Sequence, residues 1–588
     1  MIIYYFLINF LYFCSFLFFG QKLSKIFGLE KKLEQISFKY FQYPIISIAF
    51  FSYFTAILIQ FDFNIKYLSL FINFLLIITG IFFLYNKKNF FKSFDYSIVK
   101  KNLLIIIIFI SYLLFTLSPI LDADSLTYHA YFPKKILADN RFYFDHYNFH
   151  EKLIGVMEFF YVVPLYIKSE YTIQLINFFS ILSIISIFYK ILNHKQNIIQ
   201  ILILLILTSP IFIQLIYSAK PQLIFLSLSL LNFCLIYNEK KIVNWNFIAF
   251  SIFIVIFNFF GKSSFLLSSL ILSIFLYTKI NKNLEIKNLF KLFIIFIIIY
   301  FPFTYAKFLV LDSFNLINLI NYITLDLPGY EEFWNNLTND AQRENLFPLN
   351  LLFPTNLNSL SSSFGLWPFI LIFVFRKNKY LILPLILFLF MIISGLKSSR
   401  FYLEPLLWVS FILLNNINIE KKKENYLFNL SILQIIPMFG LIIFVSIYFF
   451  ATNFSEKIKF KRLNDHAYGF AFNQKINDII ETKDFVIYNL RTIYYGENNL
   501  IYPEFEKYTD DEFYFREILV KKPKYLVLID ANINNTIYKK CKNKLVHSSK
   551  IRGKVKRKNI LLNNLTDKNI STINIYKFLE NVKMSCLN

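Results

Sequence analysis

Charged residues are scarce in this chain: only 17% of its 588 residues are Asp, Glu, Lys or Arg, against roughly 25% in a typical soluble domain. Hydrophobic residues make up 56% and aromatic residues 20%, and the mean hydropathy is +0.51. This composition excludes an ordinary soluble domain and predicts a polytopic, α-helical membrane protein.

Cysteine is also rare, with four residues in the whole chain. None of them forms a CxxC pair or a Cys/His spacing typical of zinc, so the sequence gives no sign of a zinc site. Cys14 and Cys234 lie in apolar stretches, whereas Cys541 and Cys586 lie in a polar C-terminal tail. If that tail is extracytoplasmic, a Cys541–Cys586 disulfide can form; two free thiols are the alternative.

Acidic residues are outnumbered, because 37 Asp and Glu stand against 61 Lys and Arg, which gives a net charge of +24. The basic residues separate apolar stretches instead of lining one face, so we expect no nucleic-acid partner. Cytoplasmic loops are enriched in Lys and Arg, and every second loop here is basic. The loops between them are short or acidic, and we expect them, including 120–171 and 311–363, to face the periplasm or exterior.

A transmembrane helix needs about 20 mainly apolar residues. About fourteen stretches qualify or come close: 2–20, 44–61, 66–85, 103–119, 172–190, 198–217, 222–238, 245–260, 262–278, 292–310, 364–376, 379–396, 401–416 and 428–451. The first lacks a charged start and a small-residue cleavage site, so we expect a retained helix and not a signal peptide. The shorter run Gly155–Ile167, interrupted by Glu158 and Pro164, is expected as a helix lying in the membrane interface.

The pattern divides the chain into three predicted domains. Residues 1–102 form an N-terminal transmembrane extension of three helices, 103–452 a transmembrane core with the two exterior loops, and 453–588 an extracytoplasmic α/β domain. Strands of this last domain are expected at Phe485–Tyr488, Tyr525–Ile529, Leu545–Ser548, Ile560–Leu562 and Ile573–Tyr576. Its basic run Lys539–Lys558 is read as a solvated face, with contact to anionic lipid headgroups as the alternative.

The acidic start of the first long exterior loop is the strongest candidate for chemistry. Asp122 and Asp124 follow an apolar stretch directly, so their carboxylates are expected at the membrane interface, where ionisable groups are often functional. The pair can deprotonate an acceptor hydroxyl or hold a divalent cation, Mg or Mn, on a phosphate. The structural alternative is a helix cap, with Asp124 or Ser125 as the expected N-cap of a helix near 125–138.

Two further groups accompany these carboxylates in the same loop. His129 lies one helical turn after Ser125, and a catalytic or a structural histidine fits this position. Glu151 and Lys152 open the predicted interfacial helix. Lys152 can bind a phosphate while Glu151 holds a metal, a hydroxyl or a neighbouring base, although an ordinary helix-start charge pair explains them equally.

Three cations lie at the expected exterior ends of later spans: Lys220, Lys262 and Arg400. Each stands in apolar sequence, where desolvation makes a cation unfavourable unless an anion is present. A lipid phosphate is the natural anion. Snorkelling explains the two lysines equally well, whereas the guanidinium of Arg400 can hold a phosphate through two hydrogen bonds.

Together these features resemble the GT-C superfamily of polyprenyl-phosphate-dependent glycosyltransferases, which includes aminoarabinose and mannosyl transferases. The resemblance rests on Asp122-Ala-Asp124 followed by SLTYH, on HEKLIGVMEFF entering an interfacial helix, and on RFYLEP at Arg400. A second long exterior loop and an exterior C-terminal domain add to it. Four spans precede the acidic loop here, three more than the one that the family usually has, and Leu153 follows the EK pair where proline is common.

The resemblance implies a GT-C-like fold of about fourteen transmembrane helices with a small C-terminal extracytoplasmic α/β domain. It implies inverting transfer of a monosaccharide from a polyprenyl-phosphate donor to a glycan, lipid or protein acceptor in cell-envelope glycan biosynthesis. The expected place of this reaction is the outer face of a bacterial inner membrane. Asp122 or Asp124 would act as base or orient the acceptor. Lys152, Lys220 and Arg400 would neutralise the departing phosphate.

Two rival functions remain open at this point. An O-antigen polymerase or ligase also has many spans and a large exterior loop, but it depends on exterior arginines, which are few here. A flippase or transporter of lipid-linked sugars needs polar residues within its spans and often shows internal repeats. The sequence shows few charges within the apolar stretches and no evident repeat.

Overall fold

The computed structural model describes residues 2–61, 63–86, 102–142, 154–192, 196–280, 286–309, 351–352, 363–393, 398–415, 421–481, 484–490, 492–497, 499–501, 521–531, 541, 543–553 and 570–579. The chain forms two compact units, which are described separately. The helical unit comprises Met1–Pro119, Gly155–Phe303 and Leu337–Asn453, and the sheet unit comprises Ile120–Ile154, Thr304–Asn336 and Phe454–Asn588.

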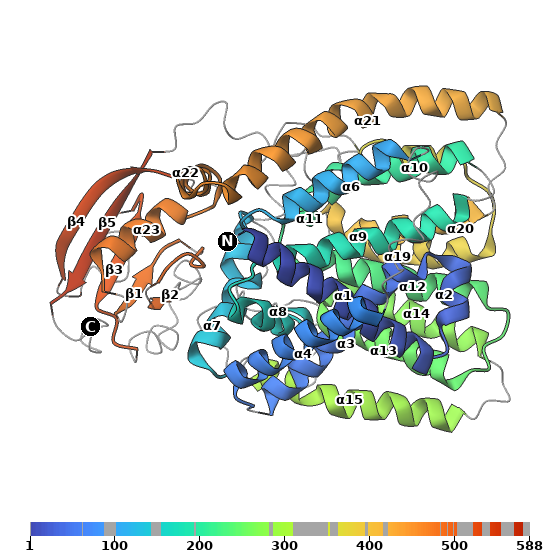
Figure 1. Cartoon of the computed structure of the whole chain (residues 1–588), viewed down its shortest axis with the longest axis horizontal. Coiled ribbons are helices and arrows are strands. Elements are labelled where there is room, and N and C mark those ends of the chain that lie inside the picture. The colour runs from blue at the N-terminus through green and yellow to red at the C-terminus, as the bar shows by residue number, and fades with distance from the viewer. Residues whose placement is uncertain are drawn as a thin grey trace. The chain divides into compact units, whose positions relative to one another are not determined.

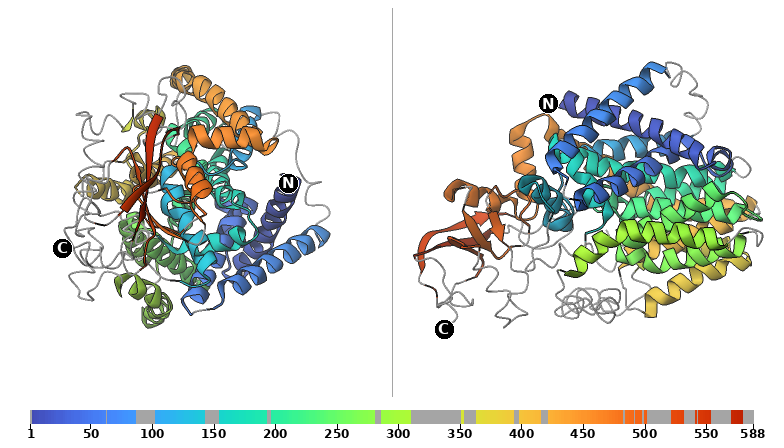
Figure 2. Two further views of the ribbon diagram at one scale, coloured as in Figure 1. Left: turned by 90° about the vertical axis from the view of Figure 1, so that its left-hand side faces the viewer. Right: turned by 90° about the horizontal axis from the view of Figure 1, so that it is seen from below.

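The helical unit is a bundle whose helices run largely alongside one another in all three views (Figures 1 and 2). Its elements are α1 (Ile2–Ile26), α2 (Glu30–Ile36), α3 (Lys39–Gln60), α4 (Ile65–Asn86), α6 (Leu103–Thr116), α8 (Val156–Tyr166), α9 (Tyr171–Leu192), α10 (Gln196–Leu207), α11 (Pro210–Ile216), α12 (Gln222–Asn238), α13 (Trp245–Gly261), α14 (Leu266–Lys279), most of α15 (Ile286–Leu309), α18 (Trp367–Phe373), α19 (Ile382–Ile393), α20 (Ser399–Asn415) and α21 (Lys421–Phe450).

Every predicted span coincides with a helix or with a broken pair of helices, but their lengths differ. Among the described residues, five helices are long and apolar enough to cross a membrane, namely α1, α3, α4, α9 and α21. The pair α10 and α11 makes a sixth if it counts as one span, bent by 53° at its break. The break follows from Pro210, because proline is favoured at the first position of a helix and cannot continue the one before it. Most remaining apolar helices have 10–17 residues.

Small residues allow the first helices to pack closely. At Gly20 of α1 and Gly80 of α4, an added Cβ would overlap the backbone of Tyr43 and of Leu11, respectively. Such close approach through glycine is typical of helix pairs in membranes, where van der Waals contact replaces the hydrophobic effect as the driving force. These contacts hold α1 against α3 and α4.

The prediction that Gly155–Ile167 forms a helix in the membrane interface is wrong. Helix α8 forms within the expected range, but its residues from Val156 to Pro164 are all buried, and it packs against α3, α4 and α13. A helix lying on a membrane would leave one face outside the protein. Glu158, which interrupted the apolar pattern, accepts a hydrogen bond from the backbone N–H of Gly155 at 3.0 Å and so caps the helix.

Helix α12 occupies the centre of the helical unit. Its residues from Gln222 to Ile236 are all buried, and it packs against α9, α13, α14 and α20. A helix that is apolar on all sides is expected to be buried on all sides. The start of α12 is therefore enclosed by other helices.

The sheet unit contains η2 (Ser125–His129), α7 (Tyr131–Asp139), α22 (Glu456–His466) and α23 (Phe470–Ile479) with five strands. These are β1 (Phe485–Tyr488), β2 (Asn499–Ile501), β3 (Tyr525–Ile529), β4 (Asn543–Arg552) and β5 (Ile570–Phe578), in the order β2-β1-β3-β5-β4. Strand β1 pairs in parallel with β2 and β3, whereas β5 is antiparallel to β3 and β4.

The strand predictions for this domain are confirmed at four places. Strands β1 and β3 have the predicted bounds, and β4 and β5 extend the predicted ones. The expected strand at 560–562 lies outside the described residues, and β2 was missed. Strand β4 lies at an edge and is mostly exposed, and its Lys and Arg protect such an edge against pairing with another chain.

Candidate functional site

The start of α12 brings two of the predicted cations into one region of the helical unit. Lys220 lies two residues before Gln222, the first residue of α12, and its side chain is only 4% exposed. The Gln222 amide donates a hydrogen bond to the backbone carbonyl of Arg400 at 3.4 Å. Arg400 is the second residue of α20. The first turn of α20 therefore lies against the first turn of α12.

Lys262 approaches the same turn from another side. It is the residue that ends α13, and the Asn258 side chain of α13 donates to the backbone carbonyl of Phe225 at 3.3 Å. The Phe225 ring packs against Phe257 and Phe265, on either side of Lys262 in sequence, with centroids 5.4 and 5.5 Å apart. The segment that carries Lys262 therefore packs against the first turn of α12, as does the first turn of α20, which carries Arg400. We call this region the α12 cation site.

This arrangement favours an anion. The first backbone N–H groups of a helix have no partner inside the helix and carry partial positive charge, and Pro221 gives α12 no side-chain cap. The Ser399 hydroxyl close by is buried and has no hydrogen-bond partner within the part of the chain that is described. Phosphate oxygens can accept from the cations, the hydroxyl and the helix N-terminus together.

A carboxyl group lies one helical turn farther along α20. Glu404 is 2% exposed, it accepts a hydrogen bond from the Ser229 hydroxyl of α12, and the Ser268 hydroxyl of α14 is a second partner. Across the described residues, Glu404 takes part in no ion pair. The α12 cation site therefore has a carboxyl group with hydroxyl partners on its inner side.

In the sheet unit, Asp122 is a helix cap. Its Oδ2 accepts from the backbone N–H of Ser125 at 3.0 Å and from the Ser125 hydroxyl at 2.7 Å. Asp124 is the residue before η2, as predicted, but its side chain makes no capping hydrogen bond. Asp122 makes that bond instead, because the helical turn begins two residues earlier, with the Leu126 N–H bonded to the Asp122 carbonyl at 3.0 Å. Asp122 thus follows the structural alternative for this residue.

Asp124 and His129 are both buried, with exposed fractions of 4% and 2%. The His129 ring lies against the Tyr128 ring, with centroids 4.0 Å apart. The segment is anchored within the sheet unit, since Lys134 donates to the Tyr494 carbonyl at 2.6 Å and Tyr495 donates to the Ile120 carbonyl at 2.9 Å. Asp124 is therefore held in a fixed helical turn.

Two predicted site residues, Glu151 and Lys152, lie outside the described residues, as does nearly all of the loop 311–363. Cys541 is disulfide-bonded, and its predicted partner Cys586 lies outside the described residues too. No group of three or more His, Cys, Asp and Glu with the geometry of a metal site occurs where the structure is described. Because Asp122 Oδ2 is used by Ser125, the pair Asp122 and Asp124 does not form a ready divalent-cation site, and we derive no step through a metal.

Comparison with protein families gives a match to the DUF1420 N-terminal domain over residues 77–462, more than half of the chain. The chain belongs to this family. The matched region contains Asp122, Asp124 and the whole α12 cation site. No curated protein and no solved structure matches the chain.

Sequence reasoning missed Gln222, Ser229 and Glu404. A signal for Glu404 was present, because a carboxylate four residues after Arg400 in an apolar stretch is a functional candidate by default and shares a helix face with it. The two polar partners carry no such signal, because Ser and Gln are common in the apolar stretches of this chain. Only the packing of α12 against α20 reveals their positions.

Proposed function

We propose that this protein is a membrane glycosyltransferase of GT-C type. It transfers a monosaccharide, with inversion, from a polyprenyl-phosphate donor to a glycan, lipid or protein acceptor. The α12 cation site carries the proposal. Three cations on segments that meet at one helix start without a side-chain cap match the chemistry of a lipid-carrier phosphate.

In the proposed reaction, the acceptor hydroxyl oxygen attacks the anomeric carbon of the donor sugar. The bond from this carbon to the lipid phosphate breaks, the phosphate leaves with the electron pair, and the hydroxyl proton passes to a carboxylate. Lys220, Lys262 and Arg400 neutralise the charge that develops on the leaving phosphate, which lowers the barrier more than it strengthens ground-state binding. The resemblance of the acidic turn to the loop of GT-C enzymes, and not a contact between the two units, assigns the base to Asp124, since Asp122 serves as a cap.

The proposal includes the arrangement in the membrane. About fourteen spans, with the cation site, the acidic turn and the C-terminal domain on the exterior side of a bacterial inner membrane, agree with the alternation of basic loops. The helices shorter than a full span would then cross with tilt, or in a locally thinner bilayer. Side-specific labelling at Asn588 and in the basic loop near Phe90 should find the two on opposite faces.

Binding of the lipid carrier tests the cation site. In nanodiscs, we expect the full-length protein with Arg400→Ala to bind undecaprenyl phosphate about 10- to 100-fold more weakly than the wild type, because hydrogen bonds to charged groups are lost. Arg400→Lys should give an intermediate affinity, since an ammonium lacks the planar fork. Arg376→Ala, at an exposed position of the same unit, is the matched control and should bind normally. Unchanged binding by Arg400→Ala would contradict the proposal.

Transfer of the sugar tests the acidic turn. We expect Asp124→Asn to lower transfer by about 10²- to 10⁴-fold, the range for a general base, while undecaprenyl phosphate still binds. Asp122→Asn should lower thermal stability as well as transfer, because the Ser125 N–H and hydroxyl lose a charged acceptor. Full transfer activity in both variants would exclude the carboxylate mechanism.

A lipid-linked sugar flippase is the second candidate, favoured by one observation. The bent pair α10 and α11 leads directly to Lys220, and broken helices line the binding sites of many transporters. Proteoliposomes separate the two functions. A transferase forms a new glycoside in the presence of acceptor, whereas a flippase moves a fluorescent lipid-linked sugar between leaflets and forms no product.

A further inference from the structure

A cavity lies in the helical unit at the starts of α6, α10 and α21, away from the α12 cation site. Its volume is about 430 Å³, within the roughly 300–1,000 Å³ of ligand pockets, and it is lined by residues from α6, α10 and α21. We propose that this cavity binds a phospholipid with a primary-amine headgroup, such as phosphatidylethanolamine. This proposal does not depend on the proposed function.

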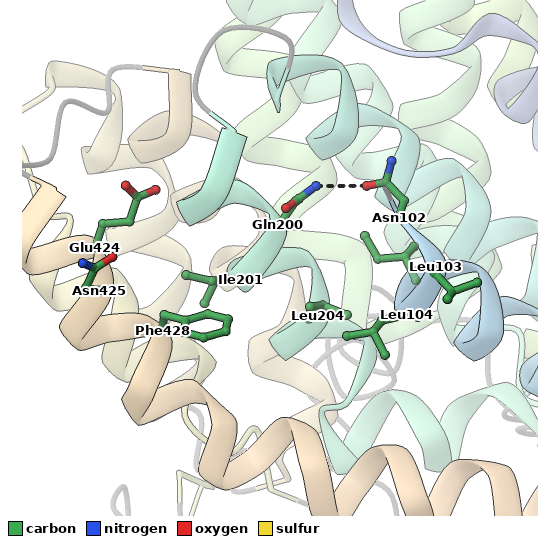
Figure 3. Close-up of a pocket in the computed structure, with 10 residues that line it drawn as sticks. Asn102, Leu103, Leu104, Gln200, Ile201, Leu204, Glu424, Asn425 and Phe428 are labelled. Atoms are coloured by element: carbon green, nitrogen blue, oxygen red, sulfur yellow. Dashed lines mark hydrogen bonds between the residues drawn. The ribbon is translucent and has the colours of Figure 1, made fainter. Parts of the chain in front are cut away.

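The mouth of the cavity is polar (Figure 3). Asn102, which precedes α6, accepts a hydrogen bond from the Gln200 amide of α10 at 3.1 Å and donates to the Tyr189 hydroxyl at 2.5 Å. Glu424 and Asn425 of α21 lie across the cavity from them. The amides of Asn102 and Gln200 are thus held in place by each other and by Tyr189. This mouth offers fixed hydrogen-bonding groups to a headgroup.

The wall of the cavity is apolar and incompletely covered. Leu103, Leu104 and Phe428 line it while 56%, 47% and 48% exposed, whereas Ile201 and Leu204 form its buried floor. Exposed apolar surface next to fixed polar groups fits an amphiphile, with its acyl chain against the leucines and the phenylalanine. A small polar metabolite would leave this wall uncovered.

The charges at the mouth select the headgroup. Glu424 is the one charged side chain among the lining residues, and it follows Lys423 in the first turn of α21. A zwitterionic headgroup can place its ammonium on the Glu424 carboxylate and its phosphate beside Lys423 at the N-terminus of the helix. A choline headgroup has no N–H to donate, and a glycerol headgroup, as in phosphatidylglycerol, has no cation for Glu424.

The cavity and the α12 cation site are separate sites. They share no residue, and the break between α10 and α11 and all of α11 lie between Gln200 and Lys220 in the chain. A variant in one site is therefore expected to leave ligand binding in the other unchanged. This independence allows the failure of one proposal to be told from the failure of the other.

Photolabelling tests the proposal. The full-length protein in phosphatidylcholine nanodiscs is labelled with phosphatidylethanolamine that carries a diazirine on its acyl chain, and labelled peptides are identified by mass spectrometry. We expect label on α10 and α21 near Ile201, Leu204 and Phe428. Unlabelled phosphatidylethanolamine should compete about fivefold better than added phosphatidylcholine or phosphatidylglycerol, the size expected for one partly exposed ion pair.

Three variants make the result specific. Glu424→Gln should abolish the headgroup preference, and Leu204→Trp should remove the label by filling the cavity. Glu30→Gln, which changes an acidic residue in the first turn of α2, should behave as wild type. Leu204→Trp counts as folded if it binds undecaprenyl phosphate normally or keeps the melting temperature of the wild type. If it does neither, Ile201→Phe is used to fill the cavity instead. Equal competition by all three lipids, a preference that survives Glu424→Gln, or label only on other helices would overturn the proposal.

Discussion

The two ends of the bent pair α10 and α11 hold polar groups in different ways. At the α12 cation site, Lys220 and Glu404 are 4% and 2% exposed, and apolar helices enclose them. At the cavity near the start of α10, Gln200 and Glu424 are half-buried. Burial of an ionised group is unfavourable without a partner, whereas a half-exposed one keeps contact with water. The comparison shows that Lys220 and Glu404 lie away from water, whereas Gln200 and Glu424 keep contact with it. The two proposals, a phosphate at α12 and an amphiphile at the cavity, differ in the same way.

The largest expected effect is a loss of folding stability when the close packing of α8 against α13 is disturbed. An added Cβ at Gly155 would overlap the carbonyl oxygen of Gly261, next to Lys262. To make room for this Cβ, the start of α8 and the end of α13 would have to move apart, and this movement would displace Lys262. We therefore expect Gly155→Ala to reduce the free energy of unfolding by about 3 kcal/mol or more, measured by thermal unfolding in detergent.

Gly440 of α21 provides the control for this substitution. Nothing lies within 4 Å of an added Cβ at Gly440, so Gly440→Ala should be neutral or stabilise the helix by about 0.5–1 kcal/mol. A similar small effect of Gly155→Ala would show that the α8 and α13 backbones are not in close contact. The close packing of α8 against α13 next to Lys262 would then be contradicted.

Elements bounded by clear local signals could be predicted from the sequence. Helix α12 has the predicted bounds, because Lys220 and Pro221 precede it and Glu239 begins a polar turn. Strands β1 and β3 likewise have the predicted bounds, since their apolar runs are short and rich in β-branched residues.

Features that depend on packing could not be predicted in this way. The sequence of α8 is compatible with an interfacial or a buried helix, and only its contacts with α3, α4 and α13 decide between them. Strand β2 has three residues, too few for a periodic pattern to appear. The role of Asp122 as a cap depends on where the helical turn begins, and boundaries are the least predictable part of an element.

A smaller effect is expected from removing one buried cation. Lys220→Met keeps the apolar stem and removes the charge, so we expect undecaprenyl phosphate to bind about tenfold more weakly. The stability of the free protein is measured beside binding, because a lysine that mainly holds neighbouring groups together would lower it when replaced. Lys241→Met, at an exposed position after α12, should change neither quantity. A loss of stability without a loss of binding would assign Lys220 a structural role instead.

The smallest expected effect is a difference in folding stability between changes at Glu404 and at Glu424. Ser229→Ala removes a hydroxyl donor from Glu404, and we expect a loss of about 1 kcal/mol in the free energy of unfolding, because the buried oxygen loses a partner. Ser227→Ala is the matched control, since the Ser227 hydroxyl donates only to the Ile224 carbonyl of its own helix at 2.9 Å, and its loss should change stability by less than about 0.5 kcal/mol. Glu424→Gln at the cavity mouth should also stay within about 0.5 kcal/mol, because water solvates a half-buried carboxylate. Equal effects of Ser229→Ala and Glu424→Gln would mean that burial does not separate the two ends, and the case for a charged ligand at α12 would lose its physical basis.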